Sequence, residues 1–256
     1  MTKSNLSRRS LLARSGAVAS AALLASVAGS VVLSTPVYAD SSATTPTGED
    51  IRKALSRYQR NRDRVRSGRP SPNGWEMEKT TDGGGSVWTR PVPGTPLSGV
   101  AVRIGEVETV LVHVIRRFHY EVDQLRKGEV TGWRSPGKVH KGLPEGNQAS
   151  GTAVRIRPEF YPAGAKGGFF PPQLVVIRDI LAELDGVVRW GGDDRRTDES
   201  LFYIDVKPGD PRLTALVEKL RTWQDTPSEG AGTPVDVLAD DRRAAAKALQ
   251  RSQRGS

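Results

Sequence analysis

The chain of 256 residues contains no cysteine, only three histidines and few aromatic residues. The lack of cysteine excludes a disulfide scaffold, an iron–sulfur cluster, a thiol nucleophile and a cysteine-ligated zinc site. The histidines leave three imidazoles at most for metal binding or acid–base catalysis. Aromatic residues make up 6% of the chain, and the tryptophans do not interleave with the basic runs, so we predict no nucleic-acid partner.

The formal net charge of +9 is carried mainly by the two ends of the chain. Residues 70–239 contain 21 basic and 23 acidic side chains, whereas residues 49–69 contain eight basic and three acidic ones. Another basic run follows Asp240. We therefore expect a near-neutral globular region between basic flanks. Residues 51–69 are a candidate contact for anionic wall polymers or lipid headgroups, with a solvated linker as the alternative.

The first 39 residues have the composition of a targeting segment. Arg8 and Arg9 precede a mildly apolar stretch over residues 16–33, and residues 37–39 have the small-x-small form of a signal-peptidase site. This pattern resembles a twin-arginine export signal, which implies export as a folded protein to the medium or the cell wall. The stretch is too rich in Ala, Ser and Gly to span a bilayer well, so we predict cleavage after Ala39 rather than a membrane anchor.

After this segment, the spacing of apolar residues predicts one compact α+β domain. Residues 40–96 are expected to form a flexible leader, a basic helix and a Gly/Pro-rich segment, residues 97–223 the domain, and residues 224–256 a flexible basic tail. Within the domain we predict strands at 100–104, 130–133, 152–157, 187–190 and 201–206, and helices at 107–125, 173–184 and 210–223. This order favours a small, mostly antiparallel sheet packed against helices.

Four short segments follow one another as the motifs of a known family do. They are Thr131-Gly132-Trp133-Arg134-Ser135, residues 147–156, Trp190-Gly191-Gly192-Asp193 and Asp198-Glu199-Ser200-Leu201-Phe202. They resemble the S-G-Y-R-S, S-x-H-x-x-G-x-A-x-D-I, W-G-G-D/N and D/E-x-x-H-F motifs of zinc D-alanyl-D-alanine carboxypeptidases and related peptidoglycan peptidases. The resemblance implies a D-Ala-D-Ala carboxypeptidase-like fold over residues 97–223.

In that family two histidines and an aspartate hold Zn²⁺, and a carboxylate acts as base on the zinc-bound water. The three ligand positions are occupied here by Gln148, Arg155 and Leu201. An amide, a permanent cation and an aliphatic side chain together cannot bind Zn²⁺, so we predict no metal, no cofactor and no intact catalytic site. The base position remains as Asp198, and the substrate arginine as Arg134.

The resemblance therefore predicts an exported, non-catalytic protein of the cell envelope, a pseudoenzyme of a metallopeptidase family. Two roles are open for Arg155: an ion pair with Asp198 that fills the former site, or a cationic pocket with Arg134 that binds the carboxylate of a peptidoglycan stem peptide. For the second role the candidate ligand-binding residues are Arg134, Gln148, Ser150, Arg155, Trp190, Asp193 and Asp198. The rival is an active D,D-carboxypeptidase or endopeptidase with a rearranged metal site.

Other candidate groups are expected to be structural. His113 and His119 lie on different faces of one predicted helix, and His140 lies in a solvated loop. Arg195 and Arg196 lie among Asp193, Asp194 and Asp198, which predicts a salt-bridged loop rather than a cation site. The S-x-x-K pattern at residues 135–138 contains Pro-Gly, which favours a turn over the helix that a serine acyltransferase would need.

Overall fold

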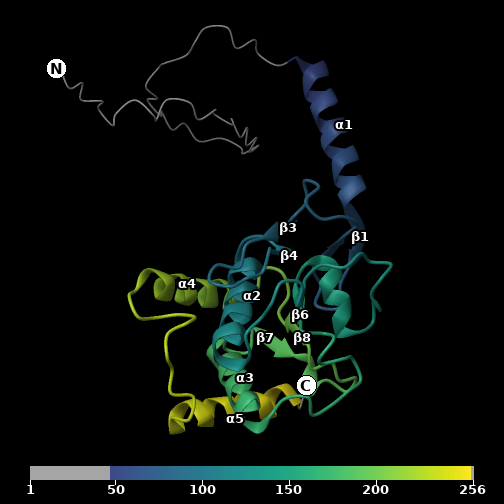
Figure 1. Cartoon of the computed structure of the whole chain (residues 1–256). Coiled ribbons are helices and arrows are strands. Elements are labelled where there is room, and N and C mark those ends of the chain that lie inside the picture. The colour runs from purple at the N-terminus through teal and green to yellow at the C-terminus, as the bar shows by residue number, and fades with distance from the viewer. Residues whose placement is uncertain (1–46, 255–256) are drawn as a thin grey trace, which may run out of the picture. The chain divides into compact units, whose positions relative to one another are not determined.

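The computed structural model describes residues 47–254 (Figure 1). The predicted signal peptide at residues 1–39 and most of the leader lie outside the described residues. These residues belong to one compact unit. Short antiparallel sheets and helices make up this unit, which confirms the α+β class.

The central sheet has four antiparallel strands in the order β5-β6-β8-β7. These strands are β5 (Val130–Thr131), β6 (Ala153–Ile156), β8 (Leu201–Ile204) and β7 (Val188–Trp190). Arg155 on β6 lies opposite Thr131 on β5 and opposite Leu201 on β8. Three segments that are distant in sequence therefore meet in adjacent strands at Arg155.

Helices pack on this sheet through the apolar spacing that the sequence shows. The main helix, α2 (Glu106–Arg117), continues into a π-helix, η1 (Phe118–Val122). Its buried residues include Val107, Val110, Leu111, Val114, Ile115 and Phe118, which belong to one core with the strands. The helices α3 (Pro171–Glu183) and α4 (Pro211–Asp225) contribute the other buried apolar faces. The predicted helices are thus confirmed within a few residues at each end.

Compact packing begins earlier than the boundary expected at residue 97. Three strands lie before that boundary: β1 (Arg66–Pro70), β2 (Glu76–Glu78) and β3 (Val87–Arg90). The predicted strand β4 (Val100–Arg103) follows it. β1 pairs with β2, and β3 pairs with β4. Trp75 Nε1 donates to the Val206 carbonyl at 2.8 Å, which ties this part to the end of the sheet. Strands of three to five residues between glycines carry too little periodicity for a sequence pattern to reveal them.

The C-terminal segment also differs from the expected flexible tail. Residues 240–254 form α5 (Asp240–Arg254), which packs against α3 (Figure 1). Arg242 donates to both carboxylate oxygens of Asp179 at 2.7 Å, and Gln253 Nε2 donates to the Val188 carbonyl at 3.0 Å. The anchoring groups lie about 60 residues earlier in the chain, so local composition gave no sign of them.

The predicted basic helix is confirmed as α1 (Gly48–Val65). It begins with a capping box between Thr47 and Asp50, and its only buried residue is Val65. Among residues 47–254, no helix combines the length and the apolar character needed to cross a membrane.

Candidate functional site

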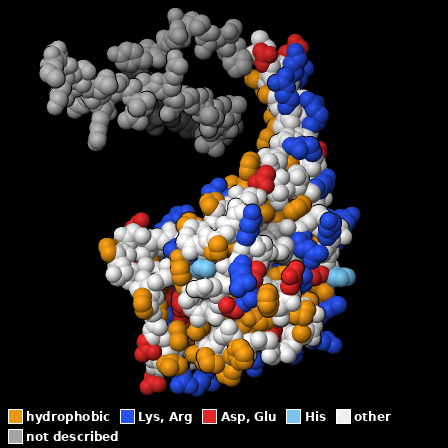
Figure 2. All heavy atoms as spheres, in the orientation of Figure 1, with side chains coloured by type: hydrophobic (Ala, Val, Ile, Leu, Met, Phe, Trp, Pro, Cys, Tyr) orange, Lys and Arg blue, Asp and Glu red, His pale blue; other side chains and the backbone are white. Residues whose placement is uncertain are grey.

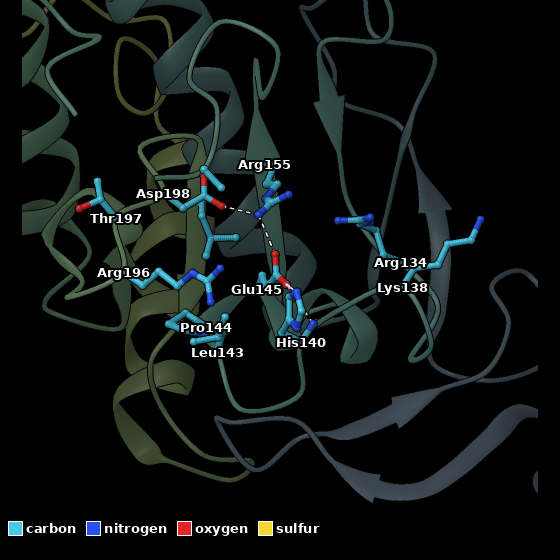
Figure 3. A pocket seen from close by; sticks show the side chains of 12 residues that line it. Arg134, Lys138, His140, Leu143, Pro144, Glu145, Arg155, Arg196, Thr197 and Asp198 are labelled. Carbon is cyan, nitrogen blue, oxygen red and sulfur yellow. Dashed lines mark hydrogen bonds and ion pairs between the residues drawn. The ribbon is translucent and has the colours of Figure 1, made fainter. Parts of the chain in front are cut away.

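A pocket of about 280 Å³ opens where the loop after β5, the 3-10 helix η2 (Pro144–Ser150), strand β6 and the segment before β8 meet. Arg155 lies at its centre, with Glu145 and Asp198 on either side (Figure 3). Leu201 also lines the pocket. Residues 155, 198 and 201, which align with two ligand positions and the base position of the family that the motifs resemble, thus line one pocket.

Arg155 is held between two carboxylates. Its Nη2 atom lies 2.5 Å from Asp198 Oδ2 and 2.8 Å from Glu145 Oε2, and its side chain is only 14% exposed. We refer to these three residues as the salt-bridged triad. A largely buried arginine is tolerable because two anions surround it. This geometry favours the structural role of Arg155, with Glu145 as a second partner that the motif does not predict.

Both carboxylate oxygens of Asp198 have partners, Oδ2 through the ion pair with Arg155. Besides Arg155, its Oδ1 accepts from Ser200 Oγ at 2.6 Å and from the Ser200 backbone N–H at 3.2 Å. Its own backbone N–H donates to the Gly191 carbonyl at 2.9 Å, so the 3-10 turn η3 (Gly191–Asp193) positions the residue. Asp198 therefore serves as an acceptor in a fixed network.

The residues at the three ligand positions do not fit a zinc ion. Gln148 is fully buried in η2, and its amide N–H group donates to the carbonyls of Gly132 at 2.7 Å and Thr131 at 3.2 Å. Its Oε1 atom has no partner among the described residues. Leu201 offers no donor atom, and the Arg155 guanidinium would repel a cation. The described part of the chain contains no group of three His, Asp or Glu residues arranged to hold a metal.

Three further cations surround the triad without acidic partners. Arg134, Lys138 and Arg196 line the pocket, and within residues 47–254 nothing pairs with their side chains. Figure 3 shows Arg134 and Lys138 on one side of the triad and Arg196 on the other. We refer to these three as the rim cations. The triad has a net charge of −1, so the rim cations bring the pocket to +2 when His140 is neutral.

Four of the seven candidate ligand-binding residues lie outside this pocket, contrary to the sequence interpretation. Ser150 is buried and bonds to Ser71 Oγ at 2.9 Å and Thr152 Oγ1 at 2.8 Å. Trp190 is buried, and its Nε1 donates to the Glu199 carbonyl at 2.7 Å. Gln148 does not line the pocket either. Their polar atoms hold backbone and loops together.

Asp193 is the fourth candidate residue outside the pocket. Its side chain is 1% exposed and pairs with Arg178 and Arg254. Burial opposes its charge, but the two arginines outweigh burial and hold its pKa below the ordinary value. The neighbouring Asp194 pairs with Arg189 and accepts from Tyr203. The predicted salt-bridged loop is confirmed, although its arginines come from other elements.

The histidines do not form a site together. His113 Nε2 lies 2.8 Å from Glu183 Oε1, and His119 Nδ1 accepts from the Leu125 N–H at 2.8 Å, so both are structural as predicted. His140 lies at the mouth of the pocket, with 75% of its side chain exposed. The segment at 135–138 is a turn closed by Lys138 N–H and the Ser135 carbonyl.

No family model, curated protein or solved structure matches this chain. The motifs and the pocket are therefore what bear on its function.

Sequence reasoning missed several residues that line the pocket. The S-x-x-K pattern relates Lys138 to Ser135 alone, and Arg196 stands in the sequence only as a neighbour of aspartates. Glu145 lies three residues before Gln148 and ten before Arg155. A carboxylate so close in sequence to the arginine at position 155 was a signal that the two could pair. Nothing in the sequence distinguishes Arg196 from the adjacent Arg195, which is exposed and does not line the pocket.

Proposed function

We propose that the chain is an exported, non-catalytic protein of the cell envelope. In this proposal the domain is a degenerate D-Ala-D-Ala carboxypeptidase-like fold that binds the carboxylate end of a peptidoglycan stem peptide. The order of the four motifs supports the family relationship. The register of β6 and β8 supports it too, because Arg155 lies opposite Leu201. These residues align with the aspartate and the second histidine of the family, which a metal site needs on neighbouring strands.

The rim cations carry the binding proposal. Arg134, Lys138 and Arg196 line a pocket in which the described acids are already engaged with Arg155. A guanidinium binds a carboxylate through two parallel hydrogen bonds, and such charge-assisted bonds are stronger than neutral ones. A volume of about 280 Å³ suits the end of a short peptide better than a folded partner. Arg155 supports the pocket floor rather than binding the ligand itself.

The same geometry supports a non-catalytic role. The catalytic water of the family needs a zinc ion to lower its pKa and a free carboxylate to take its proton. Here a guanidinium occupies the ligand position, and Asp198 is engaged by Arg155 and Ser200. Binding without turnover is therefore the activity that these residues can perform.

Calorimetry with a peptide that ends in D-Ala-D-Ala tests the proposal. We expect binding by the parent protein and at least about tenfold weaker binding by Arg134→Ala and Arg196→Ala, since each removes a charge-assisted contact. Arg195→Ala is the matched control, because Arg195 is adjacent and exposed but lies outside the pocket. Lack of binding by the parent, or equal affinity of Arg195→Ala and Arg196→Ala, would contradict the proposal.

Export has its own test. Mass spectrometry of the protein secreted by the producing cells should give a mature N-terminus at or next to Asp40. An intact N-terminus in the membrane fraction would contradict cleavage after Ala39.

A further inference from the structure

Helix α1 has an apolar stripe that no described residue covers. Ile51, Leu55 and Tyr58 are 42%, 54% and 62% exposed, although all three are large hydrophobic residues. Their spacing of four and three residues places them on one side of the helix. From Gly48 to Arg64 every residue is exposed except the half-buried Ser56, so the stripe stays open along the helix.

The opposite face of α1 is basic. At 100° per residue, Lys53, Arg57, Arg60 and Arg64 cluster roughly opposite Ile51. Figure 2 shows this division, with hydrophobic side chains along one side of the helix and Lys and Arg along the other. The helix contains six cations and three acids, in contrast to the near-neutral residues 70–239.

The described body contacts α1 only near its C-terminal end. Lys79 Nζ donates to the Asp63 carbonyl at 2.7 Å, Arg64 donates to the Gly83 carbonyl at 2.8 Å, and the Lys79 N–H donates to the Val65 carbonyl at 2.7 Å. These bonds fix the last turn, whereas the residues of the earlier turns, apart from the half-buried Ser56, are left exposed by the described part of the chain. Packing against the body therefore does not explain why the first turns are amphipathic.

We infer that α1 binds an anionic lipid surface, with Ile51, Leu55 and Tyr58 inserted among the headgroups. A helix with a strongly basic polar face, an apolar stripe and low overall hydrophobicity lies in the plane of a membrane interface. Anionic headgroups complement the excess of cations, and the acyl boundary covers the stripe. This attraction is independent of the pocket and would hold the body beside a membrane.

Two other binding partners of α1 account for only one of its two faces. A second copy of α1 could cover the stripe, but three side chains bury far less than the roughly 800 Å² per partner of a stable interface. An anionic wall polymer could neutralise the cations but would leave the apolar residues in water. Only a lipid interface satisfies both faces of the helix.

Vesicle flotation of the chain that starts at Asp40 tests this inference. That chain contains the whole compact unit from residue 46 and lacks the apolar stretch at 16–33. We expect binding to vesicles that contain phosphatidylglycerol, little binding to pure phosphatidylcholine, and loss of binding as salt shortens the screening length from about 10 Å at 0.1 M to about 3 Å at 1 M.

Two variants separate the contributions of the faces. The stripe variant, Ile51→Ser with Leu55→Ser and Tyr58→Ser, should lower partitioning at least about tenfold. The basic-face variant, Lys53→Gln with Arg57→Gln and Arg60→Gln, should weaken binding and flatten its dependence on salt. The matched control is Ile104→Ser with Phe170→Ser and Leu238→Ser, three exposed apolar residues on the body, which should bind as the parent does.

Circular dichroism would show whether the stripe variant keeps its body folded. Unchanged partitioning of a folded stripe variant would overturn the inference, as would equal binding to neutral and anionic vesicles. Binding to soluble polyphosphate by parent and stripe variant alike, without vesicle binding by either, would assign α1 to an anionic polymer and also overturn it. A concentration-dependent dimer that the stripe variant abolishes, again without vesicle binding, would assign the stripe to a second copy.

Discussion

Two arginine–carboxylate clusters of this molecule look alike and differ in how completely their charges are matched. At the junction of α2, α3 and α5, Arg117 and Arg242 meet Glu121, Asp179 and Glu183, a group that we refer to as the helix-junction cluster. Every cation of that cluster has a carboxylate partner. In the pocket, the salt-bridged triad is matched in the same way, but the rim cations are not.

The comparison shows that a buried arginine is not by itself a sign of ligand binding. Arg117 is 1% exposed and paired with three carboxylates, so it holds helices together. Arg155 is 14% exposed and paired with two, so it too is mainly structural. Binding capacity lies with the cations that lack a partner, because a ligand anion need not displace a carboxylate to reach them.

The largest expected effect is the loss of the Arg117 guanidinium. Arg117→Ala leaves buried Asp179 and Glu183 without their central partner, so we expect a loss of about 3–5 kcal/mol in the free energy of unfolding. Urea denaturation measures it. The exposed Arg126→Ala should change stability by no more than about 0.5 kcal/mol. Equal stability of the two variants would show that the cluster is not structural.

The second largest expected effect is a loss of stability at acidic pH, through the helix-junction cluster. Burial alone would raise the pKa of Glu183, but hydrogen bonds and charge from His113 and Arg117 outweigh it and lower the pKa from 4.5 to about 2. A carboxyl whose pKa is lower in the folded state stabilises the fold above its unfolded pKa, and this contribution disappears as the pH falls from about 5 towards 2. It amounts to roughly 3 kcal/mol or less.

Denaturation at a series of pH values compares the parent with Glu183→Gln. The variant should be less stable at pH 7 and lose less stability between pH 5 and pH 2. Parallel pH profiles would contradict the role of Glu183.

Arg155→Met should have a smaller effect on stability than Arg117→Ala. It leaves Glu145 and Asp198 facing each other in a pocket that water reaches, so we expect a loss of about 1–3 kcal/mol. The double variant Arg155→Met with Glu145→Gln should recover part of it, since one unpaired anion is removed. A larger loss for Arg155→Met than for Arg117→Ala would reverse the comparison between the clusters.

The smallest effect is local. Arg242→Ala removes the bonds from α5 to Asp179 and Glu183, so hydrogen exchange over residues 240–254 should become faster while the central sheet stays protected. The adjacent, exposed Arg243→Ala is the matched control. Uniformly faster exchange in both variants would show that α5 is not held by this contact.

The sequence predicted individual helices and strands better than it predicted the contacts between elements that are distant in the chain. The apolar spacing of α2 and the strand at Ala153–Ile156 were legible because each pattern repeats within one element. The short strands β1 to β3 and the anchorage of α5 were not, because they depend on hydrogen bonds and ion pairs with distant residues. For the same reason Ser150, Trp190 and Asp193 carried a motif match but lie outside the pocket.

By itself the sequence determined the absence of cysteine, the α+β order of elements and the basic flanks around a near-neutral region. It also determined that Gln148, Arg155 and Leu201 stand where the resembled motifs carry metal ligands. Only the tertiary structure decided which charges are matched. Glu145 reaches Arg155 from ten residues away and Asp198 from the segment before the neighbouring strand β8, whereas no acid reaches Arg134, Lys138 or Arg196 within the described residues. The physical reason is range: a residue type is a local property, but an ion pair forms only where the fold brings two charges within about 4 Å.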